Sequence, residues 1–400
     1  MTTNVKHPFG KYNGNEAEYV LRALDTEDPA NKAFPWVQRF EEAFAEKLGS
    51  KYASAVNSGT SGLHATLYAA GVGAGDEVIQ PSATVVMDAY VTLHLGAVPI
   101  FVDVDPDTWN MDVTKIEAKI TPRTKAIITV SLYGLPVDMD PIMALAKKHN
   151  LIVIDDSAET LMSRYRGGIA GTHAHFGVFS FEKSKHITSG SEGGMIVTSH
   201  EGLAVRARKF AGIGYKGLSA SAGRTSLASS VYQDPDYERF DTIGLNYRMN
   251  AVTAAVGLAQ FERVGHLVER RKAIGAMFLE AVAGCSWIRT QTVAPDVDHS
   301  YFTFGLLYLG AEQKGVSWKQ FYNRYKELGG DGFYAQWKNP YLEPSLKGKQ
   351  MGGQTFAPGL CPVAEDYQKK IMAFKTNYRD LAEARHKTQI LARLIDEIGR

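Results

Sequence analysis

The sequence has few cysteines, no long apolar run and no excess of either charge. Only two cysteines, Cys285 and Cys361, occur in the chain, so no framework of disulfide bonds is expected and a reducing cytosol suits the composition. No run of about 18 apolar residues is present, which argues against a membrane span. The N-terminal stretch MTTNVKHPFGKYNGNE lacks the apolar segment of a signal peptide. From these absences we expect a cytoplasmic protein without a membrane partner.

The charge balance argues against a nucleic-acid partner. The chain has 44 Lys and Arg residues against 43 Asp and Glu residues, and a basic excess is the usual footprint of nucleic-acid binding. Its 400 residues exceed one typical domain, and a hydrophobic content of 44% is ample for a sizeable core. The sequence therefore predicts two domains, or one large domain with a smaller one.

Short apolar runs alternate with helical patterns in the first half of the chain. Strands are predicted at 52–57, 76–81, 98–105, 124–134 and 151–159, and helices at 61–72 and 140–150. Alternation of this kind favours parallel strands joined by crossover helices. The apolar runs are nearly continuous, which agrees with parallel strands because these are buried on both faces. An α/β fold is therefore expected.

The second half of the chain has a different character. Residues 217–242 are polar and rich in Ser and Gly, and a loop of that length is usually functional or mobile. Residues 248–284 predict one or more long helices, and isolated strands such as 301–310 follow. We expect three parts: an N-terminal segment (1–35), a large domain (36–260) and a smaller C-terminal α+β domain (261–400).

The stretch NSGTSGLH at 57–64 joins a predicted strand to a predicted helix. A helix N-terminus presents unpaired N–H groups and a partial positive charge, which bind phosphate. Taken alone, an ordinary N-cap at Ser58 or Thr60 explains the stretch better. It is not a Walker loop, and no Gly-x-Gly-x-x-Gly follows the first strand.

Two aspartates, Asp155 and Asp156, end the predicted strand in LIVIDDSAE. In open α/β sheets ligands bind outside such strand ends, where a carboxylate can hold a cationic group. Taken alone, an aspartate at a strand end is more simply the start of a turn or a helix cap.

The stretch FSFEKSKHITSGSEGGMIV at 179–197 places two lysines between apolar runs. An ammonium group is costly to bury, so each lysine either reaches the surface, as we expect for Lys183, or performs chemistry. A desolvated lysine can form a Schiff base with a carbonyl group. The glycines that follow, Gly190, Gly193 and Gly194, let the chain approach a bulky ligand closely.

Together the three stretches supply what pyridoxal 5'-phosphate requires. The phosphate needs N–H and hydroxyl donors, the pyridine nitrogen needs an anion, and the aldehyde needs an amine. We therefore predict pyridoxal phosphate as the cofactor.

With these residues in view, the chain resembles the DegT/DnrJ/EryC1/StrS aminotransferases, pyridoxal-phosphate enzymes that act mostly on keto sugars attached to nucleotides. The similarity runs in order through EEAFAEKLGSKYASAVNSGTSGLHATLYAAGVGAGDEVIQP, TPRTKAIITVSLYGLPVDMDPI, LIVIDDSAE, FSFEKSKHITSGSEGGMIVT, LNYRMNAVTAAVGLAQ and CPVAE. The resemblance implies the type I aminotransferase fold, in which helices flank a mainly parallel seven-stranded sheet and a smaller α+β domain follows. It also implies a homodimer with active sites at the subunit interface.

The resemblance implies roles for single residues. Lys185 matches the lysine that forms the internal aldimine and moves a proton during transamination. Asp156 matches the aspartate that pairs with the pyridine nitrogen, and Glu159 falls where the family has Gln or His near the ring hydroxyl. Contacts with the cofactor phosphate are implied for Thr60, Ser61, Ser180 and, from the other subunit, Asn246.

Several positions depart from the family's pattern. Val85 stands where the family places an aromatic residue on the pyridine ring, so aliphatic contact or another ring takes that role. Ser131 replaces a common histidine, and an extra serine, Ser191, precedes Glu-Gly-Gly. One branch of the family has histidine in place of the lysine and dehydrates sugars. Here Lys185 takes that position and His186 follows it, so transamination is expected.

We therefore expect an aminotransferase that moves an amino group from glutamate or glutamine to a keto sugar nucleotide, with ping-pong kinetics. Alternatives are a ketone without a nucleotide, such as a cyclitol, a sugar dehydratase, or a non-catalytic sensor of the cofactor. Residues 217–242 are a candidate cover for the nucleotide sugar. Tyr215, Lys216 and Arg224 are candidate contacts, although a solvated loop explains each of them more simply.

Overall fold

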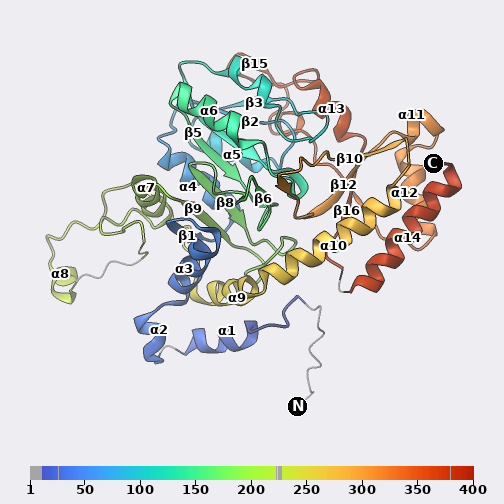
Figure 1. Ribbon diagram of the computed structural model, residues 1–400. Coiled ribbons are helices and arrows are strands. Elements are labelled where there is room, and N and C mark those ends of the chain that lie inside the picture. Colours follow the sequence, from blue (N-terminus) through green and yellow to red (C-terminus); the bar gives the residue numbers. More distant parts are fainter. Residues whose placement is uncertain (1–10, 26, 222, 224–227, 379) are drawn as a thin grey trace.

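A mainly parallel sheet of seven strands forms the centre of the larger part of the molecule (Figure 1). The computed structural model describes residues 11–25, 27–221, 223, 228–378 and 380–400. The strand order is β1-β9-β8-β5-β4-β2-β3, and β9 is the one strand of this sheet that runs antiparallel to its neighbours. The strands are β1 (Tyr52–Val56), β2 (Glu77–Pro81), β3 (Val98–Val102), β4 (Thr124–Val130), β5 (Ile152–Asp156), β8 (Phe176–Ser180) and β9 (Gly194–Thr198).

Helices cover both faces of this sheet, which explains the nearly continuous apolar runs of its strands. One face packs against helices α4 (Gly59–Ala69), α5 (Met87–His94) and α7 (Glu201–Ala211). The other face packs against α3 (Trp36–Leu48), α6 (Met139–His149) and α9 (Ala251–Glu262). The predicted α/β architecture is confirmed, and the strands and helices expected in the first half of the chain are present.

An aromatic cluster beneath β8 fixes the direction of the side chains at its end. The Phe44 ring of α3 stacks on Phe261 with centroids 4.6 Å apart, and it meets Phe179 and Phe181 edge-on. Because successive side chains of a strand point to opposite faces, burying Phe179 and Phe181 on the α3 side turns Ser180 towards α4.

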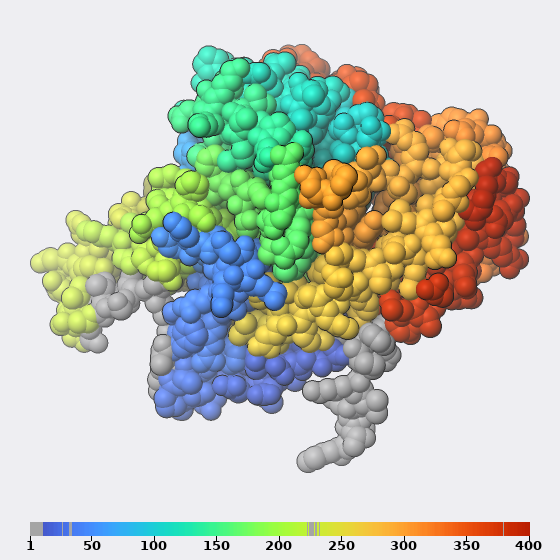
Figure 2. All heavy atoms as spheres, in the orientation of Figure 1, coloured from blue at the N-terminus to red at the C-terminus, as the bar shows by residue number. Residues whose placement is uncertain are grey.

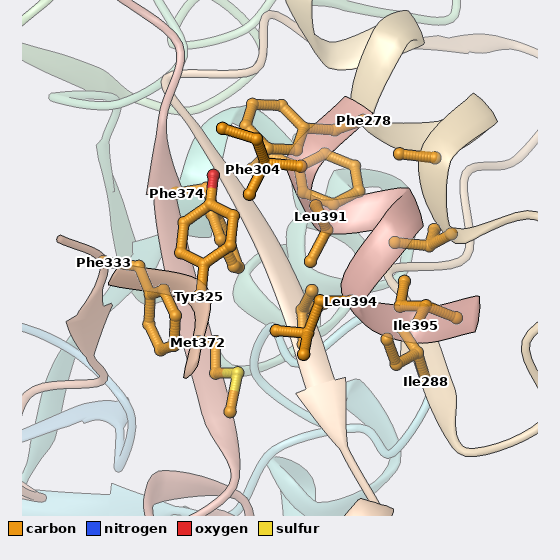
Figure 3. Packing of buried hydrophobic residues seen from close by; sticks show 14 of the residues in the cluster. Phe278, Ile288, Phe304, Tyr325, Phe333, Met372, Phe374, Leu391, Leu394 and Ile395 are labelled. Atoms are coloured by element: carbon orange, nitrogen blue, oxygen red, sulfur yellow. The ribbon is translucent and has the colours of Figure 1, made fainter. Parts of the chain in front are cut away.

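A second, four-stranded antiparallel sheet has the order β10-β12-β16-β13. Figure 3 shows part of the core that this sheet shares with the helices packed on it, in which Phe278 stacks on Phe304 with centroids 5.0 Å apart. The elements here are β10 (Ile288–Thr290), β12 (Thr303–Tyr308), β13 (Tyr334–Ala335) and β16 (Ile371–Lys375), with α10 (Val264–Val282), α11 (Gly310–Lys314), α12 (Trp318–Glu327) and α14 (Leu381–Ile398).

Part of the C-terminal third returns to the large sheet and covers its edge. The side chain of Gln354 bonds both the N–H and the carbonyl of Phe101 on β3, at 3.0 and 3.1 Å. This segment contains η4 (Pro340–Leu342), β14 (Gln350–Met351), β15 (Gln354–Thr355) and α13 (Pro362–Gln368). The predicted boundary near residue 261 remains a prediction, since residues on its C-terminal side pack against both sheets.

The remaining short elements link the parts of the chain. Figure 2 shows β6 (green) beside the segment of β11 (orange), and the two strands pair in a small sheet with β7. Helix α8 lies well away from the sheets in Figure 1. These elements are β6 (Arg164–Tyr165), β7 (Gly168–Ile169), β11 (Val297–Asp298), α1 (Glu16–Leu24), α2 (Pro29–Ala33), α8 (Ser229–Gln233), η1 (Val113–Lys115), η2 (Glu117–Lys119) and η3 (Leu132–Gly134).

Candidate active site

Polar residues gather at the edge of the large sheet where its parallel strands end. β1 leads into the start of α4, β5 ends at Asp156 and β8 ends at Ser180. Parallel strands end at the same edge, so segments far apart in the sequence meet there. The contact between Glu159, which follows β5, and Lys185, which follows β8, shows that they do.

The start of α4 is capped by Ser58 and lies beside the end of β8. The Ser58 hydroxyl accepts a hydrogen bond from the N–H of Ser61 at 3.1 Å, and the Ser61 hydroxyl donates to Asn57 Oδ1 at 2.5 Å. A Cβ added to Gly59 would lie 3.0 Å from the Cβ of Ser180. The first turn of α4 therefore brings its N–H groups and its positive end close to the Ser180 hydroxyl, an arrangement that suits a phosphate group.

Lys185 lies in the loop between β8 and β9, and 17% of its side chain is exposed. Its Nζ donates a hydrogen bond to Glu159 Oε1 at 3.2 Å and lies 4.4 Å from the centre of the Phe302 ring. Lys183 of the same loop is exposed, whereas His186 is buried and its ring centroid lies 5.7 Å from that of Phe302. Lys185 is thus the lysine of this loop that faces the strand ends.

Glu159 and Asp156 place two carboxyl groups near the Lys185 amine. Glu159 Oε2 accepts a hydrogen bond from the N–H of Tyr133 at 2.8 Å, so the turn after β4 fixes its side chain. Asp156 is buried and accepts from the N–H of Ala158 at 3.0 Å. Burial raises the pKa of Asp156 to about 6, although the Ala158 hydrogen bond and the Lys185 cation act against this rise. A cationic ligand group beside Asp156 would favour its charged form.

The neighbouring aspartate, Asp155, points to the opposite face of the sheet. Its carboxylate accepts hydrogen bonds from the hydroxyls of Thr129 and Ser157, both at 2.9 Å, and from the N–H of Gly171 at 3.0 Å. Thr129 and Gly171 belong to two other segments of the chain, so Asp155 joins both of them to the end of β5. The two adjacent aspartates therefore have different surroundings, which follows from the alternation of side chains along a strand.

Three residues beside the site escaped the sequence reasoning. Asp88 in α5 is buried and accepts a hydrogen bond from the Thr84 hydroxyl at 2.6 Å, and burial together with the Asp156 carboxylate raises the pKa of Asp88 well above its usual range. An acidic residue within the apolar run VVMDAYV was the available signal. Phe302 and Arg271 approach Lys185 from distant parts of the chain, and no local pattern marks them.

The structure places the other predicted residues as follows. Thr60 is half-buried in the first turn of α4, and Val85 is half-buried between β2 and α5. Asn246 is exposed, and the next residue, Tyr247, accepts a hydrogen bond through its carbonyl from the N–H of Asn57 at 2.8 Å. Asn246 thus lies near the start of α4 in its own chain, and its contact with a second subunit remains a prediction.

The polar segment after α7 makes contacts within itself and with α7, where Lys209 pairs with Asp241 at 2.6 Å. Lys216 pairs with Glu238 at 3.4 Å, and the ring of Tyr215 lies 4.9 Å from that of Phe240. Arg224 lies outside the residues that the structure describes. The predicted role of residues 217–242 as a cover for the substrate remains a prediction.

Comparisons with known proteins agree with this geometry. The sequence profile of the DegT/DnrJ/EryC1/StrS aminotransferase family matches residues 12–383. The chain belongs to this family. This match confirms the resemblance read from the sequence, and with it the assignment as a pyridoxal-phosphate-dependent aminotransferase.

Two curated relatives of this DegT/DnrJ/EryC1/StrS aminotransferase carry the name GDP-perosamine synthase. The chain is 44% identical over 267 residues to that of Caulobacter vibrioides, which covers 66% of this chain and 67% of the relative. It is 39% identical over 301 residues to that of Escherichia coli O157:H7, which covers 75% and 77%. The crystal structure of an aminotransferase from Psychrobacter cryohalolentis matches with a TM-score of 0.86 at 29% identity, over 96% of this chain and 97% of that one. The structural match confirms the expected type I fold.

The described residues of the aminotransferase include neither a membrane-spanning helix nor a metal-binding cluster. In the described ranges, no helix has the length and apolar character needed to cross a membrane. The same residues contain no group of three or more His, Cys, Asp or Glu side chains arranged to hold a metal ion.

Proposed function

We propose that the strand-end residues described above hold pyridoxal phosphate. The start of α4 with Thr60, Ser61 and Ser180 would hold the phosphate, Asp156 the pyridine nitrogen, and Lys185 the aldehyde carbon. When bound, the cofactor supplies an aldehyde that takes up amino groups and a ring that withdraws electrons.

The observation that carries this proposal is the meeting of an amine, a buried carboxyl group and a helix start at one sheet edge. The Lys185 amine, the Asp156 carboxyl group and the first turn of α4 come from β8, β5 and β1. Their chemistry matches the three ends of the cofactor. The half-buried Val85 would contact the ring through its methyl groups in place of an aromatic side chain.

Each side chain has a defined task in the proposed reaction. With the cofactor bound, the Lys185 amine would carry a proton between the carbon atom of the substrate and the former aldehyde carbon, so it would have to reach both. Glu159 holds this amine in place through the 3.2 Å contact. The Asp156 carboxylate, costly while unpaired, is stabilised when a protonated ring nitrogen lies against it.

We propose glutamate as the amino donor and a keto sugar linked to a nucleoside diphosphate as the acceptor. The support for a nucleotide-linked acceptor is the identity of 44% and 39% to two proteins named GDP-perosamine synthase, and glutamate is the donor that the sequence analysis expects. Glutamine as donor and a cyclitol ketone as acceptor are the alternatives that the sequence left open.

We also propose that two chains associate through the surface around residue 243. Ile243 is 92% exposed, and Phe240 and Leu245 beside it are 54% and 42% exposed. Exposed apolar residues in such a group are typical of an interaction surface. Asn246 belongs to the same segment, so association here would bring it towards a second active site. A single mass of about two chains in light scattering, shifted to one chain by Ile243→Asp, would support this.

The substrate proposal is tested by incubating the purified, cofactor-loaded protein with glutamate and a panel of ketones. The panel contains GDP-linked and TDP-linked 4-keto and 3-keto sugars and a free cyclitol ketone. We expect 2-oxoglutarate to form with a nucleotide-linked sugar and the Lys185→Ala variant to form none. Turnover with the cyclitol ketone alone would contradict the acceptor class. Release of water from the sugar without consumption of glutamate would indicate a dehydratase instead.

A further inference from the structure

Arg271 of α10 is a buried cation that bonds the main chain of the proposed catalytic lysine. Arg271 is 6% exposed. Its Nη2 donates hydrogen bonds to the carbonyls of Ser184 and Lys185, at 3.0 and 3.2 Å. Its Nη1 donates to the carbonyl of Phe302 at 2.7 Å and to Thr376 Oγ1 at 3.0 Å. The guanidinium thus joins the lysine loop of the large sheet to the second sheet.

Burial of this guanidinium is costly, which calls for an explanation beyond packing. Burial and the neighbouring Arg270 cation lower the pKa of Arg271 to about 9, while Glu159 acts in the opposite direction. A charged buried group is tolerated when its donors are well bonded. A charged donor also makes stronger hydrogen bonds than a neutral one. Two of these hydrogen bonds hold the carbonyls of Ser184 and Lys185 in place.

The lysine loop needs external support because it has little regular structure of its own. This loop is the segment between β8 and β9. Within it the N–H of Lys185 donates a hydrogen bond to the carbonyl of Glu182 at 2.9 Å. Fixing the Lys185 carbonyl as well fixes the plane of the following peptide, and with it the direction of the Cα–Cβ bond. That direction sets where the side chain starts, and the contacts of Nζ with Glu159 Oε1 and the Phe302 ring set where it ends.

The second terminal nitrogen of Arg271, Nη1, holds the residue whose ring the lysine amine contacts. Phe302, whose carbonyl Arg271 bonds, presents its ring 4.4 Å from Lys185 Nζ and 5.5 Å from Arg271 Cζ. Thr376 also donates to the Phe302 carbonyl, at 2.9 Å. One guanidinium therefore fixes both the main chain that carries the amine and the ring that the amine contacts.

We propose that Arg271 is a positioning residue that aims the Lys185 amine through the carbonyls of residues 184 and 185. This inference rests on the proposed function, because it assigns Arg271 to the step in which Lys185 reacts with the cofactor and moves a proton. The hydrogen bonds of Arg271 reach Lys185 through its main-chain carbonyl, not through its amine. Its loss should slow reactions of the Lys185 amine and leave substrate affinity nearly unchanged.

The first test compares Arg271→Lys with a matched control, Arg208→Lys, in the cofactor-loaded protein. Arg208 is also 6% exposed and also bonds main-chain carbonyls, those of Ala53 and Ala220, but it lies in α7 away from Lys185. A misplacement of about 1 Å lowers a rate by up to about 100-fold. We expect Arg271→Lys to lower kcat by about 10- to 100-fold with KM within about threefold, and Arg208→Lys to change neither.

The second test measures the lysine directly, without turnover. Cofactor-free protein is mixed with pyridoxal phosphate, the new carbon–nitrogen double bond is reduced with borohydride, and the modified Lys185 is counted by mass spectrometry over time. We expect slower modification in Arg271→Lys than in Arg208→Lys. Thr376→Val, which removes one acceptor of the Arg271 guanidinium, should show the same pattern more weakly and serves if Arg271→Lys does not fold.

The third test separates positioning from a general structural effect. In Lys185→Ala, an added primary amine such as methylamine can take over proton transfer from solution. If Arg271 acts through Lys185, then Arg271→Lys leaves this rescued rate unchanged. An equal loss in both backgrounds, or unchanged kcat and modification in an intact Arg271→Lys protein, would overturn the proposal. A wild-type protein that neither binds pyridoxal phosphate nor consumes glutamate would overturn the proposed function, and this inference with it.

Discussion

Replacing Asp156 by Asn should stabilise the cofactor-free protein and weaken its hold on the cofactor. Asp156 is 5% exposed, and its pKa of about 6 against an ordinary 3.8 means that the folded protein resists its ionisation. An asparagine is neutral at every pH and keeps an oxygen that can accept from the Ala158 N–H. The substitution also removes the negative charge that faces the buried Asp88.

The size and the pH dependence follow from the two pKa values. A difference of about two units corresponds to about 3 kcal/mol at 1.36 kcal/mol per unit. Well below the ordinary pKa of 3.8 the carboxyl group is protonated in both states, so the cost is absent. As the pH rises, the unfolded chain loses the proton first, so the folded protein loses stability until about pH 6, above which the full cost remains. The stabilisation by Asp156→Asn should therefore grow by about 1 kcal/mol between about pH 5 and 7.5.

Urea unfolding of the cofactor-free proteins at these two pH values measures this difference. Asp112→Asn is a control of opposite sign: although burial acts to raise the pKa of Asp112, hydrogen bonds from Thr114 and Lys115 outweigh it and lower that pKa. Asp112→Asn should therefore destabilise the protein at pH 7.5. An Asp156→Asn protein that is no more stable than the wild type at pH 7.5 would refute the reasoning. So would a gain that does not change with pH.

Two further substitutions test the packing around the site. Gly194→Ala should destabilise the protein by about 1–3 kcal/mol and weaken cofactor binding, because the added Cβ would lie 2.7 Å from the main chain of Ser58. As a control, a Cβ on Gly73 would meet nothing within 4 Å. Gly73→Ala should therefore be close to neutral in the same urea titration. Phe44→Ala should cost about 3–5 kcal/mol, because it empties the centre of the cluster beneath β8, and a cost below about 1 kcal/mol would contradict the packing described.

Much of the large sheet was predictable because its signals are local. The apolar runs that became β2, β4 and β5 are short, nearly unbroken and bounded by turn residues, and every residue of β2 is buried. The short helices of the N-terminal segment and the return of residues 340–368 to β3 were not foreseen. The pairing of Gln354 with Phe101 depends on two residues that are 253 positions apart.

Some residues of the site could likewise be found from the sequence around them, whereas others are brought there only by the fold. Ser58 as an N-cap and Lys185 as the lysine facing the strand ends lie within stretches whose pattern already singled them out. In the sequence only the family resemblance separated Asp156 from Asp155, and the physical difference between them, the face of β5 to which each side chain points, depends on the packing of the sheet. Arg271 and Phe302 reach Lys185 from α10 and from the residue before β12, and their types resemble those of any buried arginine and phenylalanine.

The extra serine before Glu-Gly-Gly shows why spacing along the chain is a weaker guide than closeness in space. Gly190 and Ser191 have φ of 96° and 149°, in the region that favours glycine, and Ser191 is exposed and bridges to Glu182. The added residue therefore bulges towards solvent. Beyond it, the Gly193 carbonyl accepts from the Phe181 N–H at 2.8 Å, which restores the register of β9 against β8. That register brings the next glycine, Gly194, against the start of α4 and beside Ser180, within the proposed phosphate site.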